Sequence, residues 1–375
     1  MPTNTFTTTT TTGYGSRIGK SIGGVVMGVA MFFGAFGLLY WNEGRVDMST
    51  IAKTAVEMPS TNAVVGADFQ GKFVSTSGVV TSNEKLGDGL FVVEGDYLAI
   101  DRTVEMYAWI EEKKENTEKN TGGSETTTTT YTYKMGWTAD PMQTEEMAHP
   151  EEHENPAMAF NSDRATVADL HVGDVAVNGD VTLPPTTALS LQKDTVSLLK
   201  TDTMTAEYVF RGAGTLAQPK LGDMRVKFAV LKPGFSGTVF GTMSGSMIEE
   251  YADEEGNSLF RLFEGSRAGA IATLHNEHVV IGWVLRVVGF LLMWLGLVGI
   301  LGPLSTILDV LPFLGGASRF VVSLVTFPVA LVLSVVTILV SMILHSVIAL
   351  IVAVVVLIGV AMVVAKRFSN KAVTA

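Results

Sequence analysis

Residues 21–41 read SIGGVVMGVAMFFGAFGLLYW, and this stretch decides the fold class of the chain. It contains no charged residue, and a helix of this length, rising 1.5 Å per residue, would be about 30 Å long. That length matches the hydrocarbon thickness of a bilayer, and Tyr40 and Trp41 suit the membrane interface. Arg17 and Lys20 precede the stretch as in a signal peptide, but no small-residue cleavage site follows it. We therefore predict a retained membrane helix.

Three further apolar stretches lie in the C-terminal third of the chain. They cover residues 279–301, 320–343 and 347–365, and each is long enough to cross a bilayer as a helix. Pro328 falls inside the second of them, where a membrane helix tolerates proline. Only a few residues around His345 separate the last two, which predicts a tight helical hairpin. The chain is therefore predicted to be a membrane protein with four transmembrane helices, one N-terminal and three C-terminal.

Charge is concentrated between the first and second stretches. Residues 46–278 hold 35 of the 37 acidic residues and 18 of the 26 basic ones, which gives a formal charge of −17. This segment is long enough to bury its own core, and we expect a large extramembrane domain. Its acidity argues against nucleic acid as a partner, because phosphates are neutralised by clustered Lys and Arg. The chain has no cysteine, which excludes disulfides and Cys-based zinc sites.

Basic residues beside the apolar stretches predict the sidedness. Three groups of them agree: Arg17 and Lys20, then Arg319, then Lys366, Arg367 and Lys371. Arg45, just after the first stretch, is the one flank that disagrees, and Glu43 partly offsets it. In a four-helix arrangement all three groups fall on one side, which the positive-inside rule assigns to the cytoplasm. Both termini are therefore expected in the cytoplasm, and the acidic domain in a periplasmic, extracellular or lumenal space. Residues 1–20 are rich in threonine and expected to be disordered, and residues 366–375 are expected to form a tail.

The acidic segment is predicted to be a β-rich α+β domain. Residues 101–112 (DRTVEMYAWIEE) alternate apolar and polar side chains, and residues 126–137 (TTTTTYTYKMGW) resume β-branched and aromatic content. A polar segment with Gly122 and Gly123 lies between them, so we predict a long β-hairpin. Its aromatic residues recur at spacing two and would form either core or an exposed binding strip. Helices are expected at residues 188–199 and 266–278.

Residues 149–153 (HPEEH) fit H-x-x-E-H, in which two histidines one helical turn apart bind zinc and a glutamate acts as base. His149, Glu152 and His153 would be the metal site of a membrane-bound metallohydrolase. However, Pro150 disfavours a regular helix, and the neighbouring carboxylates are typical of a solvated loop. We therefore expect an acidic surface loop, no catalytic residue and no cofactor, and a fold that survives loss of both histidines.

Arg286 lies within the second apolar stretch, where a charge is costly in lipid. If the helix begins before residue 279, the side chain can extend to the interface, which is the interpretation we favour. The alternative is a buried partner for Asp309 or for a lipid phosphate.

The order of several short motifs resembles the LUMA family, also called transmembrane protein 43. The motifs are Asn42-Glu43-Gly44-Arg45, Val104-Glu105-Met106-Tyr107 with Trp109, Tyr131 to Tyr133 with Trp137, Asn155-Pro156, Gly222-Asp223 with Arg225, and Leu285-Arg286. The resemblance implies a lumenal or extracytoplasmic domain, cytoplasmic termini, and a role in organising membrane protein complexes and lipid domains without an enzymatic activity. The poly-threonine segments and residues 149–154 depart from the vertebrate pattern and indicate a microbial member.

The expected function is therefore that of a membrane scaffold. Its spans would gather membrane lipids and other membrane proteins and form homo-oligomers, while the acidic domain would supply a recognition surface. Besides the metallohydrolase, the second alternative is a transporter or channel component. The spans contain almost no charge to line a path, which favours the scaffold.

Overall fold

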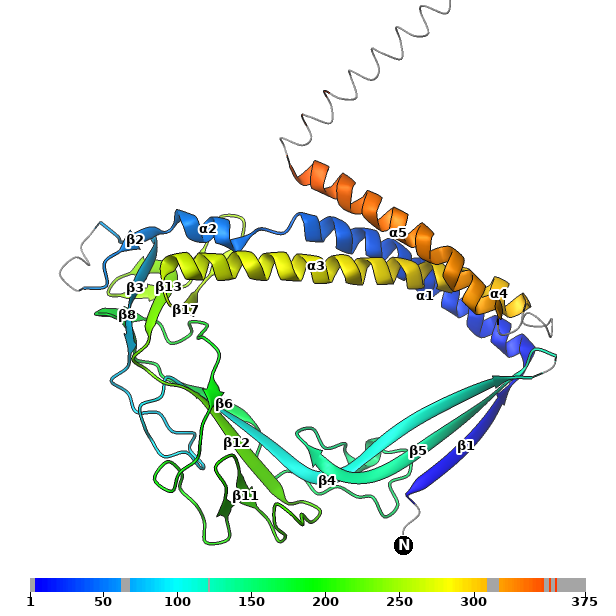
Figure 1. The fold of residues 1–375 in the computed structure, drawn as a ribbon, viewed down its shortest axis with the longest axis horizontal. Coiled ribbons are helices and arrows are strands. Elements are labelled where there is room, and N and C mark those ends of the chain that lie inside the picture. The colour runs from blue at the N-terminus through cyan, green and yellow to red at the C-terminus, as the bar shows by residue number, and fades with distance from the viewer. Residues whose placement is uncertain are drawn as a thin grey trace, which may run out of the picture. The chain divides into compact units, whose positions relative to one another are not determined.

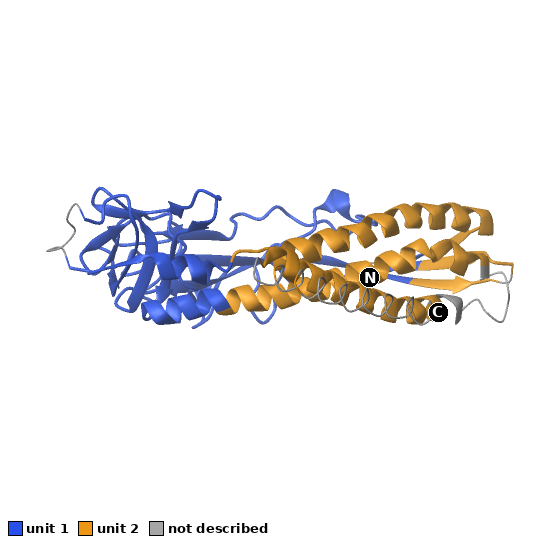
Figure 2. Cartoon of the chain, turned by 90° about the horizontal axis from the view of Figure 1, so that it is seen from above, with its two compact units in different colours: residues 1–8, 47–115, 129–275 blue, residues 9–46, 116–128, 276–375 orange. Residues whose placement is uncertain are grey.

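The computed structural model describes residues 4–61, 68–120, 122–308 and 317–346, together with Ile351 and Val355. The chain divides into two compact units, coloured separately in Figure 2. Unit 1 comprises residues 1–8, 47–115 and 129–275, and unit 2 comprises residues 9–46, 116–128 and 276–375. Each unit is described by itself.

Strands dominate unit 1, as the alternating side chains predict (Figure 1). The strands are β1 (Thr5–Thr12), β2 (Val56–Met58), β3 (Phe73–Thr81), β4 (Ala99–Lys119), β5 (Glu125–Thr138), β6 (Asp163–Thr166), β7 (Leu170–Val172), β8 (Val175–Val177), β9 (Thr187–Ala188), β10 (Thr203–Met204), β11 (Val209–Arg211), β12 (Met224–Leu231), β13 (Ser236–Ser244), β14 (Met247–Glu249), β15 (Tyr251–Ala252), β16 (Ser258–Leu259) and β17 (Arg261–Glu264). Helix α2 (Met48–Thr54) and a short 3-10 turn (Thr144–Glu146) accompany them.

Two sheets share the core of unit 1. One has the strand order β1-β5-β4-β12-β11-β10, with β6 paired to β4 and β9 paired to β12. The other has the order β17-β13-β14-β8-β7-β3-β2, with a further pairing of β13 to β3. In the first sheet Val104 of β4 lies opposite Val226 of β12, and both side chains are fully buried. One hydrophobic cluster contains these residues together with Val74 and Val239 of the second sheet.

The predicted hairpin is confirmed as β4 and β5, with Gly122 and Gly123 at positive φ in the turn. Glycine adopts this conformation at low cost, which explains why the turn forms there. Two other expectations were wrong. Residues 5–12 are strand β1 rather than disordered, because their β-branched threonines extend the sheet beside the threonine-rich β5. Residues 188–199 form no helix; they complete β9 and continue as loop that buries Leu189, Leu191 and Val196.

The described residues of unit 2 form the helices α1 (Tyr14–Glu43), α3 (Arg267–Ile300, of which residues 276–300 belong to this unit), α4 (Gly302–Leu308) and α5 (Ala317–His345), together with residues 116–120 and 122–128 of the hairpin. The helices α1 and α3 pack with their backbones close together. A β-carbon on Gly28 would lie 2.8 Å from the carbonyl oxygen of Gly296 and 2.7 Å from the amide nitrogen of Ile300. Small residues allow this approach, which is a common way for helices to associate in membranes.

The helices α1, α3 and α5 are long and apolar enough to cross a membrane. They contain the predicted stretches 21–41, 279–301 (all but its last residue) and 320–343. The fourth predicted stretch, residues 347–365, and the tail after it lie outside the described residues, apart from Ile351 and Val355.

Candidate functional site

The histidines of the H-x-x-E-H motif do not form a metal site. Residues 149–153 are turn and coil instead of helix, and Glu152 is exposed with a φ of 67°. Among the described residues, no group of three or more acidic or histidine side chains could hold a metal ion. The expectation of an exposed loop was wrong for His153, whose side chain is fully buried.

His153 instead belongs to a cluster of rings in unit 1, which we call the aromatic cluster. Its members are Phe6, Trp109, Tyr131, Tyr133, His149 and His153. His153 stacks on Tyr133 at a centroid distance of 4.1 Å and meets Trp109 edge to face at 4.8 Å. His149 stacks on Phe6 of β1 at 4.3 Å. Offset and edge-to-face pairs of this kind stabilise a site beyond the area that they bury.

The aromatic side chains of the hairpin differ in how far they are buried. Tyr133 is core, with 1% of its surface exposed, while Tyr107, Trp109 and Tyr131 are half-buried. On the opposite face Val104 and Met106 are fully buried, as the alternation predicts. The hairpin therefore packs on both of its faces.

Most of the motif positions that carry the resemblance lie around this hairpin and contact one another. Asn155 brackets Trp109: its Oδ1 accepts from the Trp109 N–H at 2.8 Å, and its Nδ2 donates to the Trp109 carbonyl at 3.0 Å. Glu105 and Arg225 form an ion pair across β4 and β12, with Nε and Oε2 2.7 Å apart. Arg225 also lies over the ring of Trp137, 4.6 Å from its centroid.

Asp223 organises the loop before β12. It is 2% exposed, and its carboxylate accepts hydrogen bonds from the backbone N–H groups of Ala213, Gly214 and Lys220 at 2.7–3.1 Å. Its neighbour Gly222 has a φ of +84°, and a β-carbon there would lie 3.0 Å from Pro156 Cγ. The turn of residues 212–214 therefore holds this carboxylate.

The remaining motif positions meet in unit 2. Arg286 donates from Nε and Nη2 to the two carboxylate oxygens of Glu43, both at 2.8 Å. Asn42 donates to the carbonyl of Gly282 at 3.2 Å, and Arg45 donates to Asn42. The helix α3 begins at Arg267, well before residue 279, as the favoured interpretation of Arg286 requires. The partner of Arg286 is nevertheless Glu43, which sequence reasoning did not name. Gly44 ends α1 beside the ring of His345.

The comparisons with known proteins agree with this grouping of motifs. The sequence profile described as Transmembrane protein 43 matches residues 106–347, which is more than half of the chain. The chain belongs to the transmembrane protein 43 family.

Relatives within the transmembrane protein 43 family align over most of their length. The Homo sapiens protein is 25% identical over 317 residues, which cover 80% of this chain and 79% of the relative. The Rattus norvegicus protein is 24% identical over 321 residues with the same coverage. The Drosophila melanogaster homolog is 24% identical over 285 residues, covering 72% of this chain and 74% of the relative. No solved structure matches the chain. The resemblance read from the motifs is confirmed.

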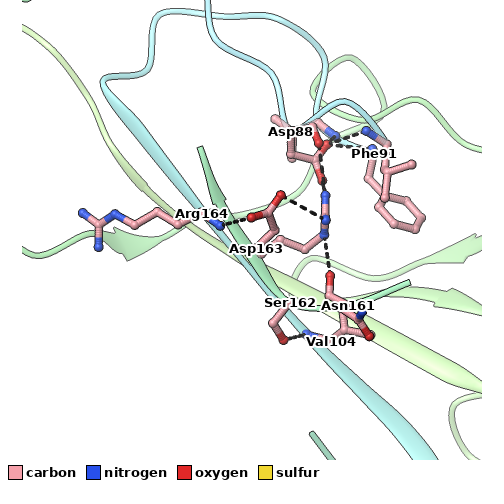
Figure 3. A network of polar contacts seen from close by, with 10 residues as sticks. Asp88, Phe91, Val104, Asn161, Ser162, Asp163 and Arg164 are labelled. Atoms are coloured by element: carbon pink, nitrogen blue, oxygen red, sulfur yellow. Dashed lines mark hydrogen bonds and ion pairs between the residues drawn. The ribbon is translucent and has the colours of Figure 1, made fainter. Parts of the chain in front are cut away.

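Sequence reasoning missed one buried ion pair in this member of the transmembrane protein 43 family, between Arg102 and Asp88. Figure 3 shows the network of polar contacts around Asp88. Arg102 Nη1 lies 2.9 Å from Asp88 Oδ2, and the two side chains are 7% and 3% exposed. Arg102 Nε also donates to the Asn161 carbonyl at 3.1 Å, and Asp88 Oδ1 accepts from the N–H groups of Phe91 and Val92. The signal was available, because the alternation puts Arg102 on the same face of β4 as Val104.

Tyr133 is expected to make stability fall at alkaline pH. Its hydroxyl donates to Glu111 and accepts from the His149 N–H at 2.8 Å; burial and the Glu111 hydrogen bond raise the pKa of Tyr133 to about 12. An unfolded tyrosine has a pKa of about 10. The contribution of neutral Tyr133 to the free energy of unfolding is therefore fully present below about pH 10 and is lost between about pH 10 and pH 12. Urea unfolding across this range should show a steeper loss for the wild type than for Tyr133→Phe; equal slopes would contradict the assignment.

Proposed function

We propose that the protein is a membrane scaffold, in which the helices of unit 2 gather lipids and other membrane proteins. The observation that carries the proposal is the apolar surface of these helices. Val26 and Phe33 of α1, Trp283 of α3, and Phe320 and Leu324 of α5 are each between 60% and 70% exposed. Large exposed apolar side chains on helices of this length are unfavourable in water and suit lipid or a membrane partner.

The polar groups of the same helices support a scaffold over a transporter. Buried hydroxyls have partners within the helices: Thr326 donates to the Val322 carbonyl of its own helix at 2.8 Å, and Ser334 of α5 donates to Met293 Sδ of α3 at 3.4 Å. The charged residues Glu43 and Arg286 form a closed bidentate pair. A transport path needs ionisable groups that face a polar cavity, and these groups face each other.

Unit 1 supplies the recognition surface in this proposal. The side chains of its aromatic cluster and of its ion pairs contact one another and present no arrangement of reactive groups toward a substrate. This suits a rigid platform better than a reaction site. The expected partners are membrane lipids, other membrane proteins and further copies of this chain, without a cofactor.

Chemical crosslinking in native membranes, followed by mass spectrometry, tests the proposal. We expect recurrent crosslinks to a small set of membrane proteins or to further copies of the chain. The matched control introduces charge on the apolar surface of α5 by Leu324→Glu, which should remove crosslinks while unit 1 stays folded. A wild-type protein that stays monomeric and without recurrent protein partners would contradict the scaffold function.

A further inference from the structure

A cavity of about 500 Å³ lies between two loop segments of unit 1. Residues 139–145 form one wall, and residues 155–158 together with Asn161 form the other. The rings of the aromatic cluster do not line it. The cavity is therefore a separate feature of the same unit.

Asn155 holds the two walls in place. Its Nδ2 donates to the Met142 carbonyl at 3.0 Å, and its backbone N–H donates to Thr144 Oγ1 at 3.2 Å. The same side chain is bonded to the backbone of β4. At the other end of the second wall, the Asn161 carbonyl accepts from the buried Arg102 at 3.1 Å. The cavity is therefore formed before a ligand arrives, which lowers the cost of binding.

The lining combines two carboxylates with apolar side chains. Asp140 and Glu145 supply the carboxylates, and neither has an ion-pair or hydrogen-bond partner for its side chain within the described part of the chain. No lysine, arginine or histidine lines the cavity. The apolar surface comes from two prolines and two methionines: Pro141, Met142, Pro156 and Met158. A complementary ligand must therefore bring a positive charge on an apolar stem.

The sequence around the cavity favours a cation as well. Residues 139–161 contain six acidic residues and no lysine or arginine. A field of one sign raises the local concentration of oppositely charged segments and speeds their association. A metal ion fits less well, because the described residues contain no group of three or more acidic or histidine side chains that could hold one.

We propose that this cavity binds a lysine side chain of a partner protein. The ammonium group would pair with Asp140 and Glu145, and the four-carbon stem would pack on the proline and methionine side chains. An ammonium donates in three directions and can serve two separate carboxylates, whereas a guanidinium prefers a single carboxylate in a planar fork. The inference rests on the proposed scaffold function and names the partner chemistry that the recognition surface selects.

Peptide binding to the full-length protein in a non-ionic detergent tests the inference. The probe is a fluorescent peptide of alternating glycine and lysine, and its counterpart with acetylated lysines is the control. We expect saturable binding of the first peptide and none of the second. Asp140→Asn/Glu145→Gln should weaken binding by about tenfold, because two partly exposed ion pairs are lost. Binding of both peptides with equal affinity would overturn the inference.

Glu151→Gln/Glu154→Gln is the matched control variant. It removes the same charge from the same loop, at two exposed positions that do not line the cavity. Solvent and salt screen such positions, so binding should weaken by less than about twofold. Equal weakening by the two double variants would show a diffuse acidic surface only and would overturn the inference.

Ala157→Phe tests the shape of the cavity without a change of charge. Ala157 is an exposed residue of the second wall, so a larger side chain fills the cavity and leaves the core intact. This variant should lose peptide binding while its urea unfolding stays that of the wild type. Peptide binding equal to that of the wild type would contradict a site inside the cavity.

Carbodiimide crosslinking in native membranes separates this inference from the scaffold function. The reagent joins a carboxylate to an amine that contacts it, so it should link Asp140 or Glu145 to lysines of partner proteins. Recurrent partners that are linked only at other carboxylates would leave the scaffold standing and overturn the inference. Peptide binding at the cavity without any recurrent partner would contradict the scaffold and still support the selectivity of the cavity for lysine.

Discussion

Replacing Arg102 by methionine is expected to lower the free energy of unfolding by about 3–5 kcal/mol, because it leaves the carboxylate of Asp88 buried without its cation. Methionine keeps much of the side-chain volume, so the loss reports charge more than packing. Asp88 retains the N–H donors of Phe91 and Val92, which keep its loop in place in the folded state. The measurement is urea unfolding of the full chain in detergent, followed by hydrogen exchange of β4 peptides.

Asp163 provides the matched control for Arg102. Its carboxylate lies 3.6 Å from Arg102 Nη2, but its side chain is 68% exposed. Solvent screens such a pair, so Asp163→Asn should cost less than about 1 kcal/mol. Equal losses in the two variants would show that the buried pair with Asp88 is not the source of the effect.

Replacing His153 by alanine is expected to lower the free energy of unfolding by about 3 kcal/mol, because a fully buried ring is removed from between Tyr133 and Trp109. Hydrogen exchange should rise in the peptides of β5 and of β1, whose Phe6 also contacts this ring. This outcome is opposite to the one expected from the sequence, in which both histidines are dispensable.

The chemistry of His153 can be separated from its shape. Neither of its ring nitrogens has a hydrogen-bond partner within the described part of the chain, so the ring acts there by packing. His153→Phe keeps a ring of similar size and should cost less than about 1.5 kcal/mol. If phenylalanine were as damaging as alanine, the imidazole itself would be required.

Much of the fold follows from periodicity. Uncharged runs of helical length predict α1, α3 and α5, and the alternation of Val104, Met106 and Ala108 against their polar neighbours predicts β4 and its buried face. These signals are strong because lipid requires apolar side chains along a whole helix, and a sheet core requires them at every second position of a strand. The glycine pair at residues 122–123 likewise marks the hairpin turn.

The site depends on pairings between distant segments, which no local pattern contains. Glu43 and Arg286 are 243 positions apart, and Phe6 reaches His149 through a strand that composition alone assigns to disorder. A threonine-rich segment is ordered or not according to whether a partner strand is present. The H-x-x-E-H motif could be discounted locally, since two histidines and a glutamate in order do not specify a helix when Pro150 stands between them. The burial of His153 could not be predicted, because it depends on Tyr133 and Trp109, which are distant in the sequence.

The pairing of β1 with β5 also sets an order of events during synthesis. The strand β1 leaves the ribosome first, but its partner begins only at Glu125, so at 5–20 residues per second it waits roughly 6–25 s for that partner. During this interval α1 is complete and apolar, before the hairpin exists. The nascent α1 must therefore be received by lipid or by an insertion factor before β1 can pair with β5.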